Sequence, residues 1–177
     1  MKLPELNDAR ISEEIGGMLV SCLILKELRP ESQDLIQNLK TMHLTLLLTQ
    51  DIILRLYKLS DERKGTLSFK YISRHCSQSV VERRRDRALR PKLNNFRKLT
   101  KDPREHRHSY IGHLSSDDDR THLAPLVNLY DAVREAVEIW DFLIGDKVTY
   151  SLHGELDLRT AVFGNGGWHG LRSRGHA

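Results

Sequence analysis

Residues 35–58 have the sequence LIQNLKTMHLTLLLTQDIILRLYK, and this stretch decides the fold class. Its large apolar residues recur at steps of three and four, which is the period of an amphipathic α-helix. The residues that carry the pattern are Leu35, Leu39, Met42, Leu46, Ile53 and Leu56. The spacing predicts one long helix that ends at about Lys58. Because its centre, residues 46–48, is three consecutive leucines that point to several sides, we expect this to be the most buried helix.

Helices are also predicted before and after this stretch. The same period runs through residues 11–25 and through residues 126–144. A short helix is predicted to open at Leu67, and a basic helix is predicted over residues 79–99. Almost the whole first part of the chain is therefore expected to be helical.

Proline and serine residues mark the expected ends of these helices. Pro30 ends the first helix, Ser32 is a candidate N-cap for the second, and Pro125 lies near the first turn of the last. Pro91 either kinks the basic helix or splits it in two. Short links favour antiparallel neighbours. The sequence thus predicts an all-α fold, an antiparallel bundle of four to five helices that occupies residues 1–146.

The pattern changes after Gly145. Apolar and polar residues alternate there, which is typical of β-strands and predicts a small hairpin across His153-Gly154. The alternating apolar residues are Val148, Tyr150, Leu152, Leu156 and Leu158. A glycine-rich stretch follows at residues 164–168. We expect residues 147–177 to form a C-terminal extension that is partly flexible.

Composition narrows the class of protein. Two cysteines, Cys22 and Cys76, are too few for a disulfide framework, and we expect both to be reduced thiols within helices. The chain has no run of about 18 apolar residues, so no membrane span is expected. Glu13 and Glu14 stand where an export signal would have cations. These features predict a cytoplasmic protein.

The net charge of +4 is unevenly distributed. Between Arg83 and Arg107 the chain has eleven Lys and Arg but three Asp and Glu, which gives this block a net charge of +8. A basic block of this kind is typical of a surface that binds a polyanion. The alternative is a solvated face of an arginine-rich helix.

The residues at the end of this block carry a possible active site. Residues 104–113 have the sequence REHRHSYIGH, in which Arg107 precedes the polar His108 and, after five intervening positions, His113. A guanidinium stabilises charge on phosphoryl oxygens, and an imidazole exchanges a proton near neutral pH. The spacing predicts a local turn that presents both groups to one cavity.

This pattern resembles the R-polar-x(4–6)-H motif of HEPN domains, which in that family lies before the last core helix. A second segment strengthens the resemblance: residues 53–61, ILRLYKLSD, followed by Leu67-Ser68, are similar to the abortive-infection branch of HEPN-like proteins. Taken together, the resemblance covers roughly residues 10–145.

The resemblance implies a helical bundle that forms a homodimer, with two copies of the motif facing each other across the interface. Many HEPN proteins are metal-independent ribonucleases of phage-defence or toxin–antitoxin systems, and others bind nucleotides or partner proteins without known nuclease activity. Whether this chain is an enzyme therefore stays open. The partners to be expected are RNA, a second copy of the chain and an antitoxin protein.

The candidate site residues follow from the motif and the charge. Arg107, His113 and His108 are the candidate catalytic residues, and Lys98, Lys101 and Arg104 are candidates for binding the RNA backbone. No metal and no cofactor is expected in this reading.

Two alternatives remain open at the level of sequence. One is a non-catalytic helical module that binds a partner protein or a nucleotide. The other is a metal-dependent hydrolase, because His106, His108, His113 and His122 lie close together in the sequence. Arg107 and His113 also have structural readings, as an ion-pair partner and as a histidine bonded to a loop carbonyl.

Overall fold

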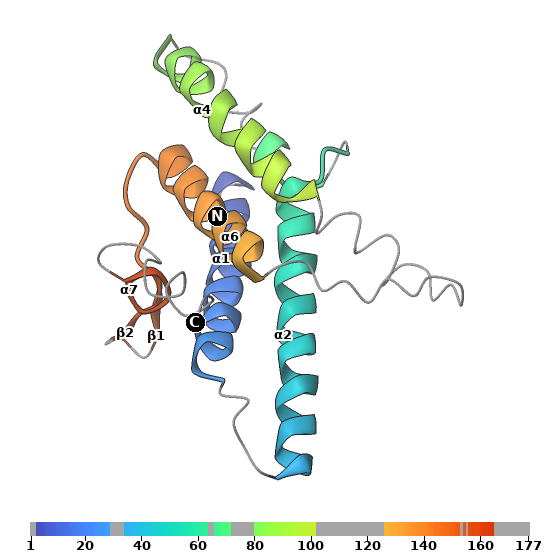
Figure 1. The fold of residues 1–177 in the computed structure, drawn as a ribbon. Helices are drawn as coiled ribbons and strands as arrows, with labels where there is room; N and C mark the ends of the chain where they lie inside the picture. The colour runs from blue at the N-terminus through green and yellow to red at the C-terminus, as the bar shows by residue number, and fades with distance from the viewer. Residues whose placement is uncertain are drawn as a thin grey trace.

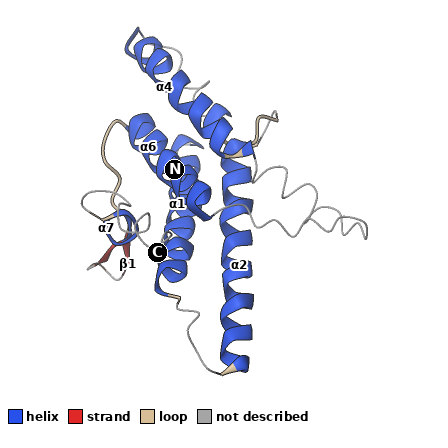
Figure 2. Cartoon of the chain, in the orientation of Figure 1, coloured by secondary structure: helices blue, strands red, loops and turns tan. Residues whose placement is uncertain are grey.

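The computed structural model shows a helical protein with one short hairpin (Figure 1, Figure 2). It describes residues 3–28, 34–63, 66–71, 80–101, 126–152, 154 and 156–164. The elements are α1 (Leu3–Glu27), α2 (Leu35–Ser60), α4 (Val80–Leu99), α6 (Leu126–Ile144), β1 (Ser151–Leu152), β2 (Leu156–Asp157) and α7 (Leu158–Phe163). The predicted all-α class is confirmed.

Helix α1 packs antiparallel against two other helices, α2 and α6. On the α2 side, Ser21 Oγ donates to Asp51 Oδ2 at 2.8 Å, and Lys58 Nζ lies 2.8 Å from Glu14 Oε1. Ser21 follows Glu14 in α1, whereas its partner Asp51 precedes Lys58 in α2, so the two helices are antiparallel.

The α6 side of α1 has the same arrangement. Trp140 Nε1 donates to Ser12 Oγ at 3.0 Å, and the Tyr130 hydroxyl donates to the carbonyl of Cys22 at 3.2 Å. Burial raises the pKa of the Cys22 thiol, with a smaller contribution from the charge of Asp51. Cys22 is thus a free, buried thiol of the core, as predicted, whereas Cys76 lies outside the described residues.

Helix α4 extends the bundle beyond α6. Lys92 Nζ lies 2.8 Å from Glu138 Oε2, and Asn95 Nδ2 donates to Glu135 Oε2 at 2.7 Å, so these two helices are antiparallel as well. Pro91 lies inside α4, which is one continuous helix from Val80 to Leu99. The basic helix is therefore not split.

The core joins all the longer helices and the C-terminal segment. Its fully buried members come from the predicted apolar stripes of α1, the C-terminal half of α2 and α6, with Leu89 and Phe96 from α4. The largest of these side chains are Trp140, Phe69, Ile11, Ile15, Met18, Leu19, Ile52, Ile53, Leu56, Leu59, Leu129 and Ile139.

One expectation about α2 is wrong. Its C-terminal half is buried, with Ile53 and Leu56 at 0% exposure, but its N-terminal half is largely exposed. Leu35, Leu39 and Met42 are 72%, 54% and 68% exposed. The apolar stripe is continuous in sequence, but the described helices cover only one half of it (Figure 1).

The N-cap expected at Ser32 is also corrected. Asp34 caps α2, because its side chain accepts a hydrogen bond from Ile36 N at 2.9 Å. Ser32 lies outside the described residues. Both residue types are good N-caps, and the one adjacent to the first helical residue occupies the position.

After α6 the chain forms the predicted hairpin and then an unpredicted helix. Leu152 pairs with Leu156 in an antiparallel register. Leu158 does not continue the second strand but begins α7, which Asp157 caps through bonds to Arg159 N and Thr160 Oγ1. The alternation of apolar and polar residues at 156–158 is too short to distinguish a strand from a helix.

Helix α7 packs on α1, where Lys26 Nζ donates to the Ala161 carbonyl at 2.7 Å. Leu158, Val162 and Phe163 are buried in the same core as the bundle, and Arg159 pairs with Asp141 of α6. The first part of the C-terminal extension thus contributes to the core. Residues 165–177, which include most of the glycine-rich stretch, lie outside the described residues.

Candidate nucleic-acid-binding surface on helix α4

The predicted motif lies in the chain between α4 and α6. Arg104, Arg107, His108 and His113 fall within residues 102–125, which are outside the described residues. The described chain ends at Lys101, just after α4, and resumes at the first residue of α6. Because α4 and α6 pack against each other, residues 102–125 connect two neighbouring helices.

Lys98 and Lys101 are the two predicted site residues whose side chains are described, and both are exposed at the C-terminal end of α4. Cations are favourable at this end of a helix because the last carbonyl groups carry partial negative charge. Their position immediately before the motif segment fits the backbone-binding role predicted for them.

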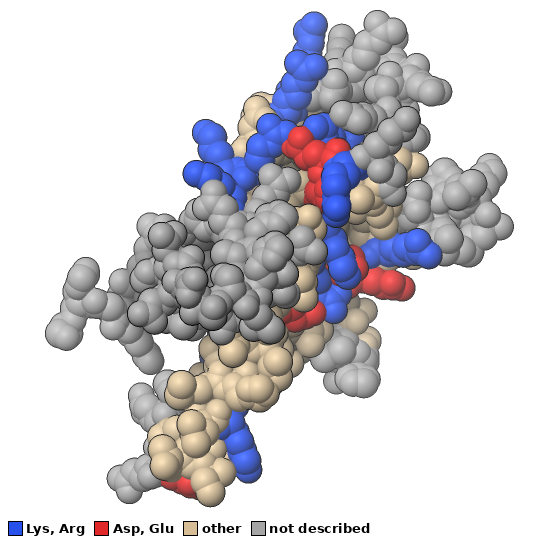
Figure 3. Space-filling model, turned by 90° about the vertical axis from the view of Figure 1, so that its right-hand side faces the viewer, with Lys and Arg blue, Asp and Glu red and all other residues tan. Residues whose placement is uncertain are grey.

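The whole described surface of α4 is basic. Residues 87–101 include six Lys or Arg and no Asp or Glu. Leu89, Phe96 and Thr100 turn into the core, so the polar residues face outward. The outward cations gather on the upper part of the molecule (Figure 3). They are Arg87, Arg90, Arg97, Lys98 and Lys101, at spacings that place them within about one third of the helix circumference.

Two of the cations of α4 are used to hold neighbouring elements. Lys92 pairs with Glu138, whose hydrogen bond raises the pKa of Lys92. Arg97 pairs with Glu62 in the loop after α2. By contrast, Arg87, Arg90 and Lys98 form no ion pair with any residue that the structure describes. These three charges are therefore available to an anion from solution.

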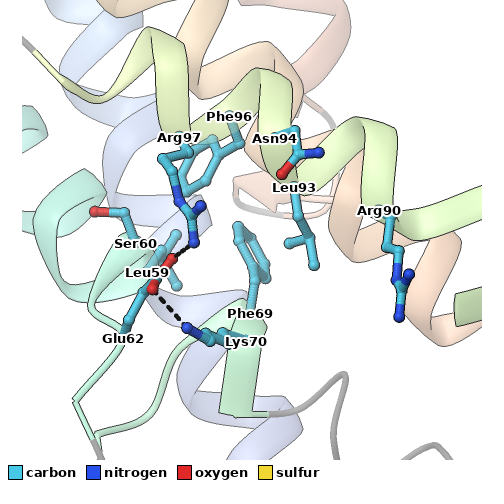
Figure 4. A pocket seen from close by; sticks show the side chains of 10 residues that line it. All are labelled: Leu59, Ser60, Glu62, Phe69, Lys70, Arg90, Leu93, Asn94, Phe96 and Arg97. Atoms are coloured by element: carbon cyan, nitrogen blue, oxygen red, sulfur yellow. Dashed lines mark hydrogen bonds and ion pairs between the residues drawn. The ribbon is translucent and has the colours of Figure 1, made fainter.

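A small cavity of about 130 Å³ lies beside this basic surface, between α4, the end of α2 and the helical residues 69–71 (Figure 4). Its floor is apolar: Phe69 and Phe96 are almost fully buried, and their rings meet edge to face with centroids 5.3 Å apart. Its rim is polar and includes Arg90, Asn94 and Glu62.

Glu62 organises one side of this cavity. Its carboxylate accepts hydrogen bonds from Lys70 Nζ at 2.5 Å and from Arg97 (Figure 4). Arg90 lies on the other side of the cavity, away from Glu62. Ser60 Oγ, the one hydroxyl among the described lining residues, donates to the Tyr57 carbonyl within the last turn of α2. The cavity thus offers charge and shape for binding, and its lining provides no group activated for chemistry.

A second charged cluster, on α1 and α2, has a structural role. Arg55 donates to Asp51 Oδ1 at 2.9 Å and to Glu14 Oε2 at 3.0 Å. Desolvation lowers the pKa of Arg55, but the hydrogen bonds and charges of Asp51 and Glu14 outweigh it and raise the pKa overall. A cavity of about 270 Å³ nearby is bordered by Glu14, Lys58, Asp61, Arg63, Thr66 and Leu67. The cations of this cluster are held in ion pairs, which tie α1 to α2.

Metal binding is not indicated in the described part of the chain. Among residues with described positions, no three His, Cys, Asp or Glu side chains come together as a metal site would require. The histidines that suggested a metal-dependent hydrolase lie between 106 and 122, outside the described residues. None of the described helices is both long and apolar enough to cross a bilayer.

Comparison with models of known protein families, with curated proteins and with solved structures gave no match to this chain. The resemblance to HEPN domains therefore rests on the motif and the second segment.

Sequence reasoning identified the basic block but did not single out three of its members. Arg87, Arg90 and Arg97 share a helix face with Lys101, and their steps of three and four residues could have shown this. The part played by Glu62 could not have been found in this way, because it pairs with a residue 35 positions away.

Proposed function

We propose that this protein binds RNA through the basic surface of α4 and cleaves it as a metal-independent endoribonuclease of a defence or toxin–antitoxin type. One observation carries the proposal. An acid-free helical surface with three unpaired cations among the described residues runs directly into the segment that holds Arg107 and His113. Phosphate contacts from Lys and Arg supply most of the sequence-independent affinity for nucleic acid.

The chemistry needs few groups, because RNA provides its own nucleophile, the 2′-hydroxyl. His113 removes a proton from this hydroxyl or donates one to the leaving 5′-oxygen, a role that contributes typically about 100- to 10,000-fold. Arg107 stabilises the charge that develops on the phosphorane oxygens. His108 positions the phosphate or orients His113. The products are a 2′,3′-cyclic phosphate and a 5′-hydroxyl.

A homodimer completes this scheme. Each chain offers one motif histidine, whereas the reaction uses both a general base and a general acid. Two copies of His113 at a shared interface supply both. A protein antitoxin would inhibit such an enzyme by covering the basic surface or the interface.

The test of the activity is incubation of the purified protein with single-stranded RNA in the presence of a chelator. Cleavage that yields cyclic-phosphate ends, and that disappears in His113→Ala and Arg107→Ala, is the expected result. Lys147→Ala is the control, because Lys147 is an exposed residue after α6 that belongs neither to α2 nor to α4. Activity that requires added metal would instead support the metal-dependent alternative.

The binding surface is tested separately from cleavage. Arg87→Gln/Arg90→Gln should weaken RNA binding and reduce the slope of log affinity against log salt by about 2, one for each lost phosphate contact. The control Lys40→Gln/Lys147→Gln removes the same charge from exposed positions on α2 and after α6. An equal loss in the control would mean that net charge, and not the surface of α4, determines binding.

A second candidate function is a non-catalytic interaction module. The exposed apolar half of α2 favours it, because patches of this kind mark sites of protein association. Tight RNA binding without cleavage, unaffected by His113→Ala, would support this module over the enzyme.

A further inference from the structure

The exposed N-terminal half of α2 lacks a partner among the described residues. Residues 35–46 span about 17 Å of helix at 1.5 Å per residue. They include the most exposed large apolar side chains of the described structure, Leu35, Met42, Ile36 and Leu39. In Figure 3 the lower end of the molecule, where this half of α2 lies, is almost free of charged side chains. Apolar surface of this extent is unfavourable in water unless something covers it.

The neighbouring helices end before they reach this region. The pairs Ser21–Asp51 and Lys58–Glu14 define the antiparallel register of α1 and α2. In that register the last residue of α1, Glu27, lies opposite position 45, so residues 35–43 extend beyond it. Helix α6 lies against the C-terminal half of α2, higher in the view (Figure 1).

Three of the exposed apolar residues and the partly buried Leu46 lie on one straight seam, whereas the exposed Ile36, Leu44 and Leu47 lie off it. We define the N-terminal seam as Leu35, Leu39, Met42 and Leu46, whose steps are four, three and four residues. These steps correspond to the a and d positions of a coiled-coil heptad, which line the contact between two helices. The same seam continues into buried Thr49, Ile53 and Leu56, so it is the core-facing stripe of α2 extended past the core.

The order of these steps makes the seam self-complementary. Four, three, four is the same sequence of steps in either direction. When two copies of α2 pack antiparallel about a two-fold axis between positions 40 and 41, Leu39 lies opposite Met42 of the other copy. Leu35 then lies opposite Leu46. Every seam residue meets another apolar residue, as an isologous two-fold interface requires.

The residues beside the seam are compatible with this pairing. The flanking e and g positions are Ile36, Asn38, His43 and Thr45, none of which is Lys, Arg, Asp or Glu. In an antiparallel pair the e positions face each other and so do the g positions, so Ile36 lies near His43 of the other copy and Asn38 lies near Thr45. Lys40, the one Lys or Arg in residues 35–50, falls on the outer side of the helix pair. The flanks therefore contain no like-charge repulsion across the two-fold axis.

We infer that the N-terminal seam of α2 is a homodimer interface, in which two copies of this helix half pack antiparallel. The inference does not depend on ribonuclease chemistry: the seam is at the end of α2 opposite Glu62 and Arg97, so it is separate from the interface at which the proposed function places two copies of His113. A seam of about three turns is short compared with the roughly 800 Å² per partner of a typical stable interface. Association is therefore expected to be reversible and to depend on protein concentration.

The test is the oligomeric state of the full-length protein, measured by sedimentation velocity over a range of concentrations. The native protein should be a dimer at high concentration. Leu39→Glu/Met42→Glu should be a monomer, because like charges then face each other at both contacts. The matched control Gln37→Glu/Lys40→Glu introduces the same residue type twice on the outer side of the same turns and should remain a dimer.

The orientation is tested by Leu39→Glu/Met42→Lys. In the antiparallel register the acidic group introduced at 39 faces the basic group introduced at 42 of the other copy, so association should return. In a parallel pair each introduced charge would face its own kind. A monomeric native protein, whose seam another segment of the same chain would then cover, overturns the inference. So does a dimer that survives Leu39→Glu/Met42→Glu, and failure of the charge pair to restore association overturns the register.

RNA cleavage by the same variants separates this inference from the proposed function. A dimer through the seam that shows no cleavage keeps the interface and removes the ribonuclease. A monomeric Leu39→Glu/Met42→Glu protein that still cleaves RNA keeps both the interface and the activity, and shows that the reaction does not need two copies of His113.

Discussion

The two halves of α2 have the same spacing of apolar residues but different surroundings. Both halves carry large apolar residues on one heptad seam, from Leu35 to Leu56. In the C-terminal half, contacts with α1 and α6 bury this seam, and Arg55 joins α2 to α1 through Glu14. In the N-terminal half the seam is exposed in the described structure.

The comparison shows that an apolar stripe specifies which face of a helix will be covered and not what covers it. Apolar residues recur at the same period whether the partner is another helix of the chain or a second molecule. The charged residues distinguish the two cases. Asp51, Arg55 and Lys58 occur in the half that packs within the chain, where Glu14 and Ser21 provide their partners.

The largest expected difference between the halves is in stability. Ile53→Ala should lower the free energy of unfolding by about 2–5 kcal/mol, because Ile53 is fully buried and its removal leaves a cavity. Leu39→Ala should change it by less than about 0.5 kcal/mol in the monomer, as at other exposed positions. Urea unfolding at a protein concentration below that of association measures both values.

Equal losses in the two variants would contradict the comparison. A large loss for Leu39→Ala in the monomer would mean that the N-terminal seam is covered within the chain. At high protein concentration a dimer contact at Leu39 would raise the free energy of unfolding of the native sequence but not that of Leu39→Ala. Repeating the measurement at high concentration therefore tests this contact.

A smaller effect is expected where α1 approaches the C-terminal half of α2. A Cβ atom at Gly17 would lie 2.5 Å from Cζ of Arg55, whereas one at Gly16 would lie 3.7 Å from the Tyr150 ring. Gly16→Ala should stabilise the protein by about 0.5–1 kcal/mol, the usual gain for alanine in a helix. Gly17→Ala should instead destabilise it by up to about 1 kcal/mol, since it displaces the end of the Arg55 side chain from its partly exposed charged partners.

A double-mutant cycle tests this reason for the effect. In an Arg55→Ala background the clash is absent, so Gly17→Ala should become stabilising, as Gly16→Ala is. If Gly17→Ala remains destabilising in that background, another contact of α1 is responsible.

Periodicity was enough to predict most of the fold, and the failures have physical causes. The stripes of α1 and α6 follow from apolar spacing, which depends on residues a few positions apart, whereas the sequence left open whether Pro91 splits α4. The expectation that α2 would be the most buried helix was wrong, because burial depends on where other helices end. Helix α7 was missed because Leu156 and Leu158 alternate like a strand, although Asp157 is a residue type that caps helices well.

The candidate site could be predicted from the sequence only in part. The net charge of residues 83–107 predicted a basic surface, and Lys98 and Lys101 are indeed exposed. The sequence did not show which cations would be neutralised, because Glu62 and Glu138 reach α4 from distant parts of the chain. The roles of Arg107, His108 and His113 stay predictions.

The smallest effect on overall stability is expected at the cap of the exposed half. Asp34→Ala removes the hydrogen bond to Ile36 N, a change that costs a helix end about 1 kcal/mol. Because residues 35–43 extend beyond α1, this end can fray without unfolding the core, so the global free energy of unfolding should fall by less than about 0.5 kcal/mol. The amides of residues 37–41 should exchange with deuterium several-fold faster, and those of residues 52–59 should not change. Asp34→Asn is the control, since asparagine caps a helix about as well as aspartate. A global loss of the full 1 kcal/mol would show that the two halves of α2 unfold as one unit and that the N-terminal half is held by more than its own helix.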